Sequence, residues 1–186
     1  MRARHSTIVS VIAFGLLCSA ALQAAPQAAD PQHTSAPIAE TPKAATITEA
    51  TRTALAGARV DIAERRFTAA ETTLQSILKE TPTLQEARVL LAIVYMEDAR
   101  GARDDDAERL LRQVLDSTPG DPQALFHLGR LTYYKQDYER ATTLFTQVSE
   151  RDPKNPAAPY YLGEIAWREY RDDQAEAAYR RALEID

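Results

Sequence analysis

The sequence repeats its features every thirty-four residues, and this period limits the possible folds more than any other property. Pro119 and Pro153 are thirty-four residues apart. Three further pairs of features have the same spacing: Leu128-Gly129 and Leu162-Gly163, Ala141 and Ala175, and Phe145 and Tyr179. Apolar residues between these markers recur at helical spacing. Because such periods are typical of stacked helical units, the sequence predicts an all-α fold.

Extending the period towards the amino terminus divides the chain into the segments 51–84, 85–121, 122–155 and 156–186. The second segment is longer by three residues, which we place in its inter-helix turn, within 100–106. Pro82, Pro119 and Pro153 are expected to end the second helices of the first three segments, because proline lacks an amide donor. The last segment stops before its closing proline and has no polar capping helix, so we expect a longer protein.

Small residues stand at two fixed positions of each segment, where neighbouring helices must approach closely. They are Ala58, Ala92, Gly129 and Gly163 at the eighth position, and Ala70, Ala107, Ala141 and Ala175 at the twentieth. With the closing prolines, this pattern resembles the tetratricopeptide repeat family. For residues 47–186 the resemblance implies an α-solenoid, a right-handed superhelix of about four helix-turn-helix hairpins.

The resemblance also implies a concave groove, lined by the first helix of each hairpin, that holds a protein or an extended peptide. The predicted groove residues lie in the last two segments: Phe126, Arg130, Tyr133, Tyr134, Tyr160, Tyr161, Glu164, Trp167 and Arg168. Aromatic residues and arginine are enriched in binding hot spots. The alternative is that some of these side chains only pack between neighbouring first helices. The lysine and asparagine that bind terminal carboxylates in chaperone-binding relatives are absent from the matching positions, so that ligand is not expected.

The first twenty-five residues are typical of a secretory signal peptide. Arg2, Arg4 and His5 precede an apolar run over 8–17, and small residues follow up to position 25. The run is shorter than the ~20 residues that cross a bilayer, so we predict cleavage and a periplasmic protein, with an uncleaved inner-membrane anchor as the alternative. Lipoprotein processing at Cys18 is disfavoured because Leu17 before it is not small.

Residues 26–46 are rich in alanine, proline and threonine and show no period, which predicts a flexible linker rather than a proline-motif ligand. Removing the leader changes the formal net charge from −5 to −7, because Arg2 and Arg4 leave with it. An acidic chain disfavours nucleic acid as a partner. Cys18 is the only cysteine, so the mature chain has no disulfide and depends on packing.

The sequence shows no pattern of catalytic residues. His33 and His127 are the histidines left after cleavage, His127 is expected at the surface, and no nucleophile or phosphate-binding motif occurs. The run Asp104-Asp105-Asp106 lacks the alternating spacing of a calcium loop and is expected to be a solvated turn. We therefore expect no enzyme activity, metal or cofactor. The prediction is a protein-interaction scaffold of the bacterial envelope; the alternative is an accessory amino-terminal region of a larger envelope-biogenesis or secretion protein or enzyme.

Overall fold

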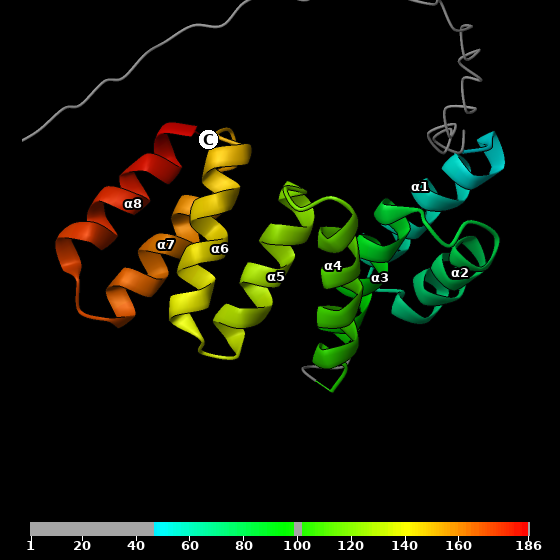
Figure 1. The fold of residues 1–186 in the computed structure, drawn as a ribbon, viewed down its shortest axis with the longest axis horizontal. Helices are drawn as coiled ribbons and strands as arrows, with labels where there is room; N and C mark the ends of the chain where they lie inside the picture. The colour runs from blue at the N-terminus through cyan, green and yellow to red at the C-terminus, as the bar shows by residue number, and fades with distance from the viewer. Residues whose placement is uncertain (1–46, 99–101, 186) are drawn as a thin grey trace, which may run out of the picture. The chain divides into compact units, whose positions relative to one another are not determined.

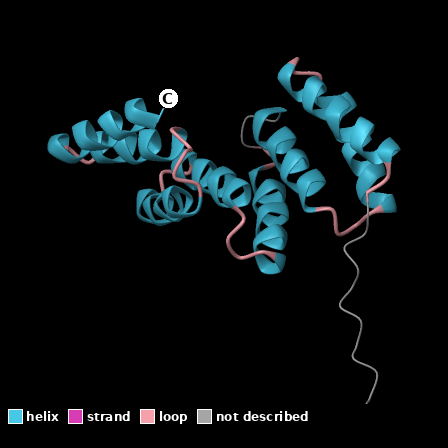
Figure 2. Ribbon diagram, turned by 90° about the horizontal axis from the view of Figure 1, so that it is seen from above, coloured by secondary structure: helices cyan, strands magenta, loops and turns pink. Residues whose placement is uncertain are grey.

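The computed structural model describes residues 47–98 and 102–185, which form eight α-helices and no strand (Figures 1 and 2). The helices are α1 Glu49–Ala63, α2 Phe67–Glu80, α3 Gln85–Asp98, α4 Asp104–Ser117, α5 Pro122–Tyr134, α6 Tyr138–Arg151, α7 Ala157–Arg168 and α8 Asp172–Ile185. This confirms the all-α fold class. The predicted leader and linker lie outside the described residues. Among the helices that the structure describes, none has the length and apolar character needed to cross a membrane.

Three hairpins close through short turns of one backbone type. The middle residue of each turn has a left-handed φ, which is 60° at Arg65, 62° at Gln136 and 58° at Tyr170. In the α5–α6 turn, the N–H of Asp137 donates to the carbonyl of Thr132 at 3.0 Å, as at a helix end capped by a left-handed residue. Such turns reverse the chain within three residues, so the two helices of a hairpin pack side by side.

The hairpins stack in chain order within the unit Ala45–Asp186. The second helices α2, α4 and α6 each pack between their own first helix and the first helix of the next hairpin. First helices also contact each other directly, α1 with α3 and α3 with α5. The predicted solenoid of helical hairpins is therefore confirmed, and Figure 1 shows the hairpins following one another in chain order.

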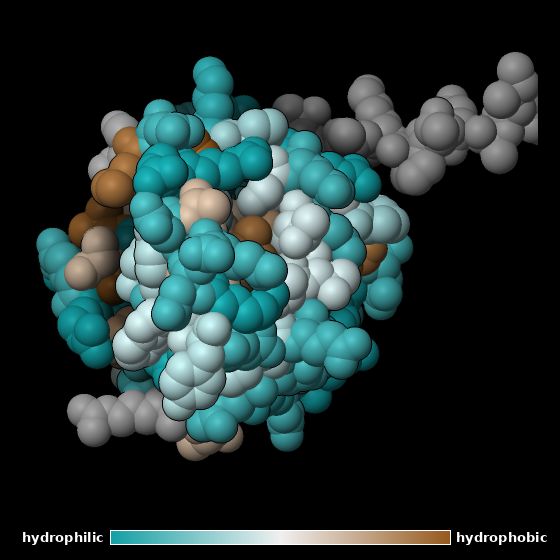
Figure 3. All heavy atoms as spheres, turned by 90° about the vertical axis from the view of Figure 1, so that its left-hand side faces the viewer, coloured by the Kyte–Doolittle hydropathy of each residue, from teal (hydrophilic) through white to brown (hydrophobic). Residues whose placement is uncertain are grey.

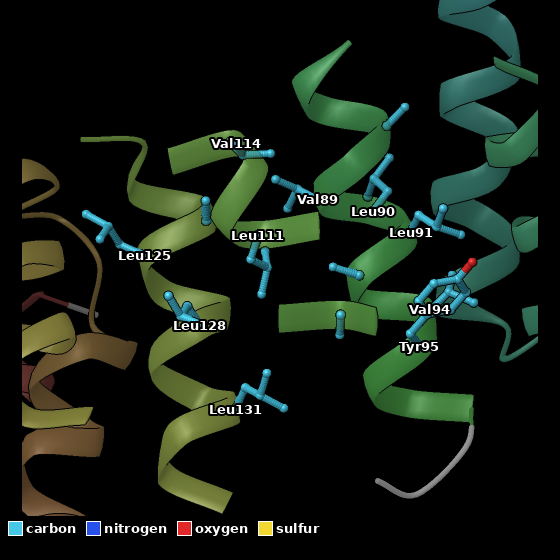
Figure 4. Close-up of a cluster of buried hydrophobic side chains, with 14 of the residues drawn as sticks. Val89, Leu90, Leu91, Val94, Tyr95, Leu111, Val114, Leu125, Leu128 and Leu131 are labelled. Carbon is cyan, nitrogen blue, oxygen red and sulfur yellow. The ribbon is translucent and has the colours of Figure 1, made fainter. Parts of the chain in front are cut away.

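Apolar side chains of successive helices form one continuous core. In Figure 4, Leu111 on α4 lies in the space between α3 and α5, while Leu91, Val94 and Tyr95 lie on the opposite side of α3. All eight small residues at the two fixed positions are buried. Their small size lets the helices approach closely. At Gly129, for example, a Cβ atom would lie 2.9 Å from the Phe145 ring, which is too close for this helix spacing.

Two sequence-based expectations need correction. The aspartates 104–106 do not lie in the turn between helices: they form the first turn of α4, where negative charge is favoured by the helix dipole. Asp106 pairs with Arg109, and Asp105 pairs with Lys135 of the α5–α6 turn. His127 is half-buried rather than at the surface, and its Nδ1 atom is buried without a hydrogen-bond partner. Packing of α5 against its neighbours, which a single-sequence pattern does not resolve, covers this ring.

Candidate functional site

Helix α5 and helix α7 carry all nine predicted groove residues, and a side-chain hydrogen bond to the first turn lies at the start of each helix. The side chain of Asp121 accepts a hydrogen bond from the amide of Ala124 at 2.7 Å, and Pro122 occupies the first turn of α5. Before α7, the side chain of Asn155 accepts from the amide of Ala157 at 3.0 Å. These bonds satisfy amide groups that have no partner within the first turn of a helix.

A hollow of about 360 Å³ lies between the end of α5, the start of α6 and α7. Five tyrosines line it: Tyr133, Tyr134, Tyr138, Tyr160 and Tyr161. Gln136, Glu164 and Arg168 complete the lining. We call this site the tyrosine hollow. Its volume is at the small end of ligand-binding pockets, so it suits a short stretch of a larger ligand.

Packed rings form the floor of the tyrosine hollow. The Tyr161 ring stacks on the Phe145 ring, with centroids 4.8 Å apart and an angle of 4° between the planes. Tyr133 meets Tyr161 edge-on, with 5.3 Å between the ring centroids, and is only 8% exposed. Offset and edge-on aromatic pairs favour fixed ring orientations. The floor is therefore a rigid part of the core rather than a set of free side chains.

One carboxylate of the lining connects α7 with both α5 and α8. Glu164 accepts hydrogen bonds from the hydroxyl of Tyr133 at 3.3 Å and from the hydroxyl of Tyr179, on α8, at 2.7 Å. The Nε–H of Arg168 donates to the Tyr133 oxygen at 2.9 Å. Burial, together with the nearby Glu164 charge, raises the pKa of both tyrosines, although Arg168 opposes the rise at Tyr133. The hydroxyls therefore remain protonated donors at neutral pH.

Other rings of the site are open to solvent. Tyr134 is 59% exposed, Tyr160 is 47% exposed and Trp167 is 59% exposed. In the space-filling view of the α7–α8 end, hydrophilic side chains cover most of the face, and paler residues of intermediate hydropathy lie between them (Figure 3). Exposed aromatic rings in such a setting can be covered by a ligand at little conformational cost.

A second hollow of about 450 Å³ adjoins the tyrosine hollow, because Tyr134 lines both. Its lining comes from α3, α5, the α1–α2 turn and the start of α4, and includes Met96, Glu97 and Arg130. Arg130 donates to Glu97 at 2.8 Å across the α3–α5 contact. Burial alone would lower the pKa of Arg130, but the hydrogen bond to Glu97, acting together with Tyr161 and Tyr134, raises the pKa above its usual value. The two hollows extend along the face made by the first helices.

The structure brings six of the nine predicted groove residues together in the tyrosine hollow: Tyr133, Tyr134, Tyr160, Tyr161, Glu164 and Arg168. Arg130 lies in the adjoining hollow, and Phe126 is half-buried against Phe145 and Tyr161. Trp167 is exposed on α7 and lines neither hollow. Sequence reasoning missed Gln136 and Tyr138, because it considered only first-helix positions. The sequence identifies Tyr179 only as the repeat position that matches Phe145, although its phenol hydroxyl is a signal of a polar contact.

The site contains groups that stack and donate hydrogen bonds, and the described residues that line it include no histidine, cysteine or serine. The nearest histidine on α5, His127, has its pKa lowered to about 4 by burial and by the charge of Arg130. Within residues 47–98 and 102–185, no group of three or more histidine, cysteine, aspartate or glutamate side chains is arranged to hold a metal ion. The geometry therefore favours recognition of a ligand by rings and hydroxyls.

Comparison with known proteins identifies two matching family models, both described as tetratricopeptide repeat, over residues 61–125 and 128–186. No curated protein matches the sequence. A thermophilic tetratricopeptide repeat protein of Thermus thermophilus is similar in structure, with a TM-score of 0.64, 18% identity, and coverage of 72% of this chain and 73% of that one.

Two other solved structures share the fold. MamA from Desulfovibrio magneticus RS-1 superposes with a TM-score of 0.60 at 17% identity, covering 73% of this chain and 75% of that one. YrrB, described as a tetratricopeptide repeat protein with an unusual peptide-binding site, superposes with a TM-score of 0.57 at 18% identity, covering 74% of this chain and 69% of that one.

Proposed function

Since this chain belongs to the tetratricopeptide repeat family, we propose that it is a protein-interaction scaffold that binds an extended segment of a partner protein along its first helices. The tyrosine hollow is the observation that carries this proposal. It combines the packed rings of its floor with two exposed rings, those of Tyr134 and Tyr160. We call these two exposed rings the rim of the hollow. YrrB, which has the same fold, is described as having an unusual peptide-binding site.

The contact residues suit protein recognition. Tyrosine and arginine are enriched in hot spots, and hot spots need pockets that are already formed. Here Tyr161 is fixed by Phe145, and Tyr133 is fixed by Glu164 and Arg168. A partner segment would therefore meet a preorganised surface, which reduces the ordering cost of binding.

The proposed place of action is the periplasm, supported by the signal-peptide pattern of the first twenty-five residues. The mature protein is then expected to begin between Leu22 and Pro26. Amino-terminal sequencing of exported material tests this; retention of Met1 would favour the inner-membrane anchor instead.

The second candidate is an accessory repeat region of a larger envelope protein or enzyme. It is favoured by Leu183 on α8, a large apolar side chain that is 78% exposed and that a further part of a longer protein would cover. Reading the native gene beyond the codon for Asp186 separates the two candidates. A catalytic domain encoded downstream would favour the accessory role, and a stop codon or further repeats would favour the scaffold.

The binding proposal is tested with the double variant Tyr134→Ala plus Tyr160→Ala. Both rings are exposed, so their removal leaves the core intact, whereas Tyr133 is buried and its removal would disturb folding. The matched control is Tyr170→Ala, which removes a 92% exposed tyrosine from the α7–α8 turn, outside the tyrosine hollow. Each truncated hot-spot ring is expected to cost about 2 kcal/mol of binding free energy.

The measurement is quantitative capture of partners from an envelope extract by the wild-type chain and both variants, with helical content checked by circular dichroism. We expect the double variant to lose partners that the wild type and Tyr170→Ala retain. Equal capture by all three folded proteins would contradict the proposal.

A further inference from the structure

The tyrosine hollow offers hydrogen-bond donors, while its carboxylate is already in use. Both oxygens of Glu164 accept tyrosine hydroxyls, one from Tyr133 and one from Tyr179. Glu164 is the only carboxylate among the described residues that line this site. The rim hydroxyls, the Gln136 amide and Arg168 can all donate to a ligand. Of these groups, Arg168 can only donate, and the hydroxyls and the Gln136 amide can donate or accept. The lining can therefore satisfy a ligand that presents carbonyl oxygens and few N–H groups.

The charges of the lining also balance. Glu164 and Arg168 are its charged side chains within the described part of the chain, and the hydroxyl of Tyr133 bridges them by hydrogen bonds. An acidic ligand group would meet Glu164, and a basic one would meet Arg168. Since each ligand charge would meet a like charge as well as an opposite one, an uncharged segment fits best.

The rings are arranged to receive flat apolar groups. Tyr160 meets Tyr161 edge-on with 5.6 Å between centroids, and Tyr134 meets Tyr133 edge-on with 5.5 Å between centroids. Edge-on contact occupies the edge of one ring and the face of the other, and both rim rings remain about half exposed. Successive ring surfaces at the rim and the floor suit the pyrrolidine rings of a polyproline II helix.

We propose that the tyrosine hollow binds an uncharged, proline-rich segment of a partner protein in the polyproline II conformation. Proline has no amide donor, and the carbonyls of a polyproline II helix are free of internal hydrogen bonds. Such a segment therefore presents the acceptors that the hydroxyls need and no excess of donors. This inference rests on the proposed function, because it specifies the ligand of the same site.

The test uses a blocked synthetic peptide of about nine residues that repeats Pro-Pro-Ala, or about three turns of a polyproline II helix. A second peptide has alanine in place of every proline, and two more carry a central lysine or a central glutamate. Binding to the mature chain is followed by nuclear magnetic resonance titration. The variants are Tyr160→Ala, Tyr160→Phe and the control Tyr170→Ala.

We expect saturable binding of the neutral proline peptide, with affinity reduced about tenfold or more by Tyr160→Ala and unchanged by Tyr170→Ala. Tyr160→Phe should fall between them, because it keeps the ring and loses the donor. The alanine, lysine and glutamate peptides should bind more weakly than the neutral proline peptide.

Equal or tighter binding of the alanine peptide would overturn the proline preference, and tighter binding of either charged peptide would overturn the neutral ligand. Unchanged binding of the proline peptide to Tyr160→Ala would overturn the assignment of this ligand to the tyrosine hollow. If no proline peptide binds while the double variant still loses its captured partner, this inference fails and the scaffold function stands. If both tests are negative, both proposals fail.

Discussion

The ring of Tyr161 on α7 lies nearly parallel to the ring of Phe145 on α6, with 4.8 Å between their centroids. Phe145 is fully buried, and its edge fills the space left by Gly129 on α5. The stack therefore joins the core of the third hairpin to the first helix of the fourth, at the floor of the tyrosine hollow. A residue in the proposed binding site is also a structural link between neighbouring repeats.

Replacing Tyr161 with alanine should destabilise the array, because it removes this stack and leaves a space beside Phe145. The free energy of unfolding is expected to fall by about 3 kcal/mol, the size typical of aromatic-to-alanine changes at buried sites. Tyr161→Phe keeps the stack and should cost much less. Urea unfolding followed by circular dichroism measures both; equal losses for the two variants would show that the hydroxyl, not the ring stack, supplies the stability.

Two glycine substitutions should have opposite effects. Gly57 lies within α1 with no atom near its missing side chain, so Gly57→Ala should stabilise the protein by up to about 1 kcal/mol through helix propensity. Gly129→Ala places a methyl group 2.9 Å from the buried Phe145 ring and should destabilise by about 1–3 kcal/mol. Melting temperatures of the two variants provide the comparison, and a shift in the same direction for both would refute this packing account.

Acid should weaken the contact between the second and third hairpins through Glu108. Burial alone would raise the pKa of this carboxyl, but hydrogen bonds from Lys135 and Arg112 outweigh it and lower the pKa to about 2. Because the pKa of Glu108 is lower in the folded protein than in the unfolded chain, where it is about 4.5, the charged carboxylate stabilises the fold above pH 4.5. This stabilisation is lost as the pH falls through about 2. Glu108→Gln should remove that part of the acid dependence and, after screening by solvent, cost on the order of 1 kcal/mol at pH 7.

Stability curves for wild type and Glu108→Gln between pH 7 and pH 2 measure this effect. The difference between the proteins should shrink as the pH falls below about 4.5. A difference that stays constant over this range would mean that the charge of Glu108 contributes nothing to folding.

His127 should add a separate loss of stability at milder acidity. Burial and the Arg130 charge lower its pKa to about 4, so the folded state keeps the ring neutral while the unfolded chain takes up a proton below about pH 6.5. The contribution of neutral His127 to the free energy of unfolding is thus fully present above pH 6.5. It is lost as the pH falls through about 4, and the loss is at most about 3 kcal/mol. His127→Leu removes the titrating group. Thermal unfolding at several pH values should show a flatter dependence for the variant in this window, and unchanged slopes would disprove the assignment.

Much of the fold follows from the sequence because a repeat protein is held together by local contacts. The small residues at Ala141 and Gly129 mark helix crossings within one hairpin, and Pro119 and Pro153 each follow the end of a helix by two residues. Small residues at these positions indicate a helix crossing in every segment, and the prolines indicate the end of a helix. The period therefore predicted the hairpins without knowledge of any distant contact.

The candidate site was less predictable because its shape depends on contacts between segments. The sequence placed Tyr133 and Tyr160 together on the first-helix face, yet Tyr133 is buried under Glu164 and Arg168 while Tyr160 is open. No period distinguishes these two tyrosines. Gln136 and Tyr138 enter the site through a turn whose middle residue is left-handed, and that geometry follows from the packing of α6 on α5.

Site-specific photo-crosslinking tests the central claim, that partners bind on the first-helix face at the tyrosine hollow, most directly. A photoreactive phenylalanine analogue would replace Tyr160 in one protein and Thr146, an exposed residue of the second helix α6, in the other. Both proteins would be irradiated in the presence of the envelope extract. The account predicts a defined crosslinked partner from position 160 and none from position 146. The same partner crosslinked from position 146 and not from position 160 would contradict it.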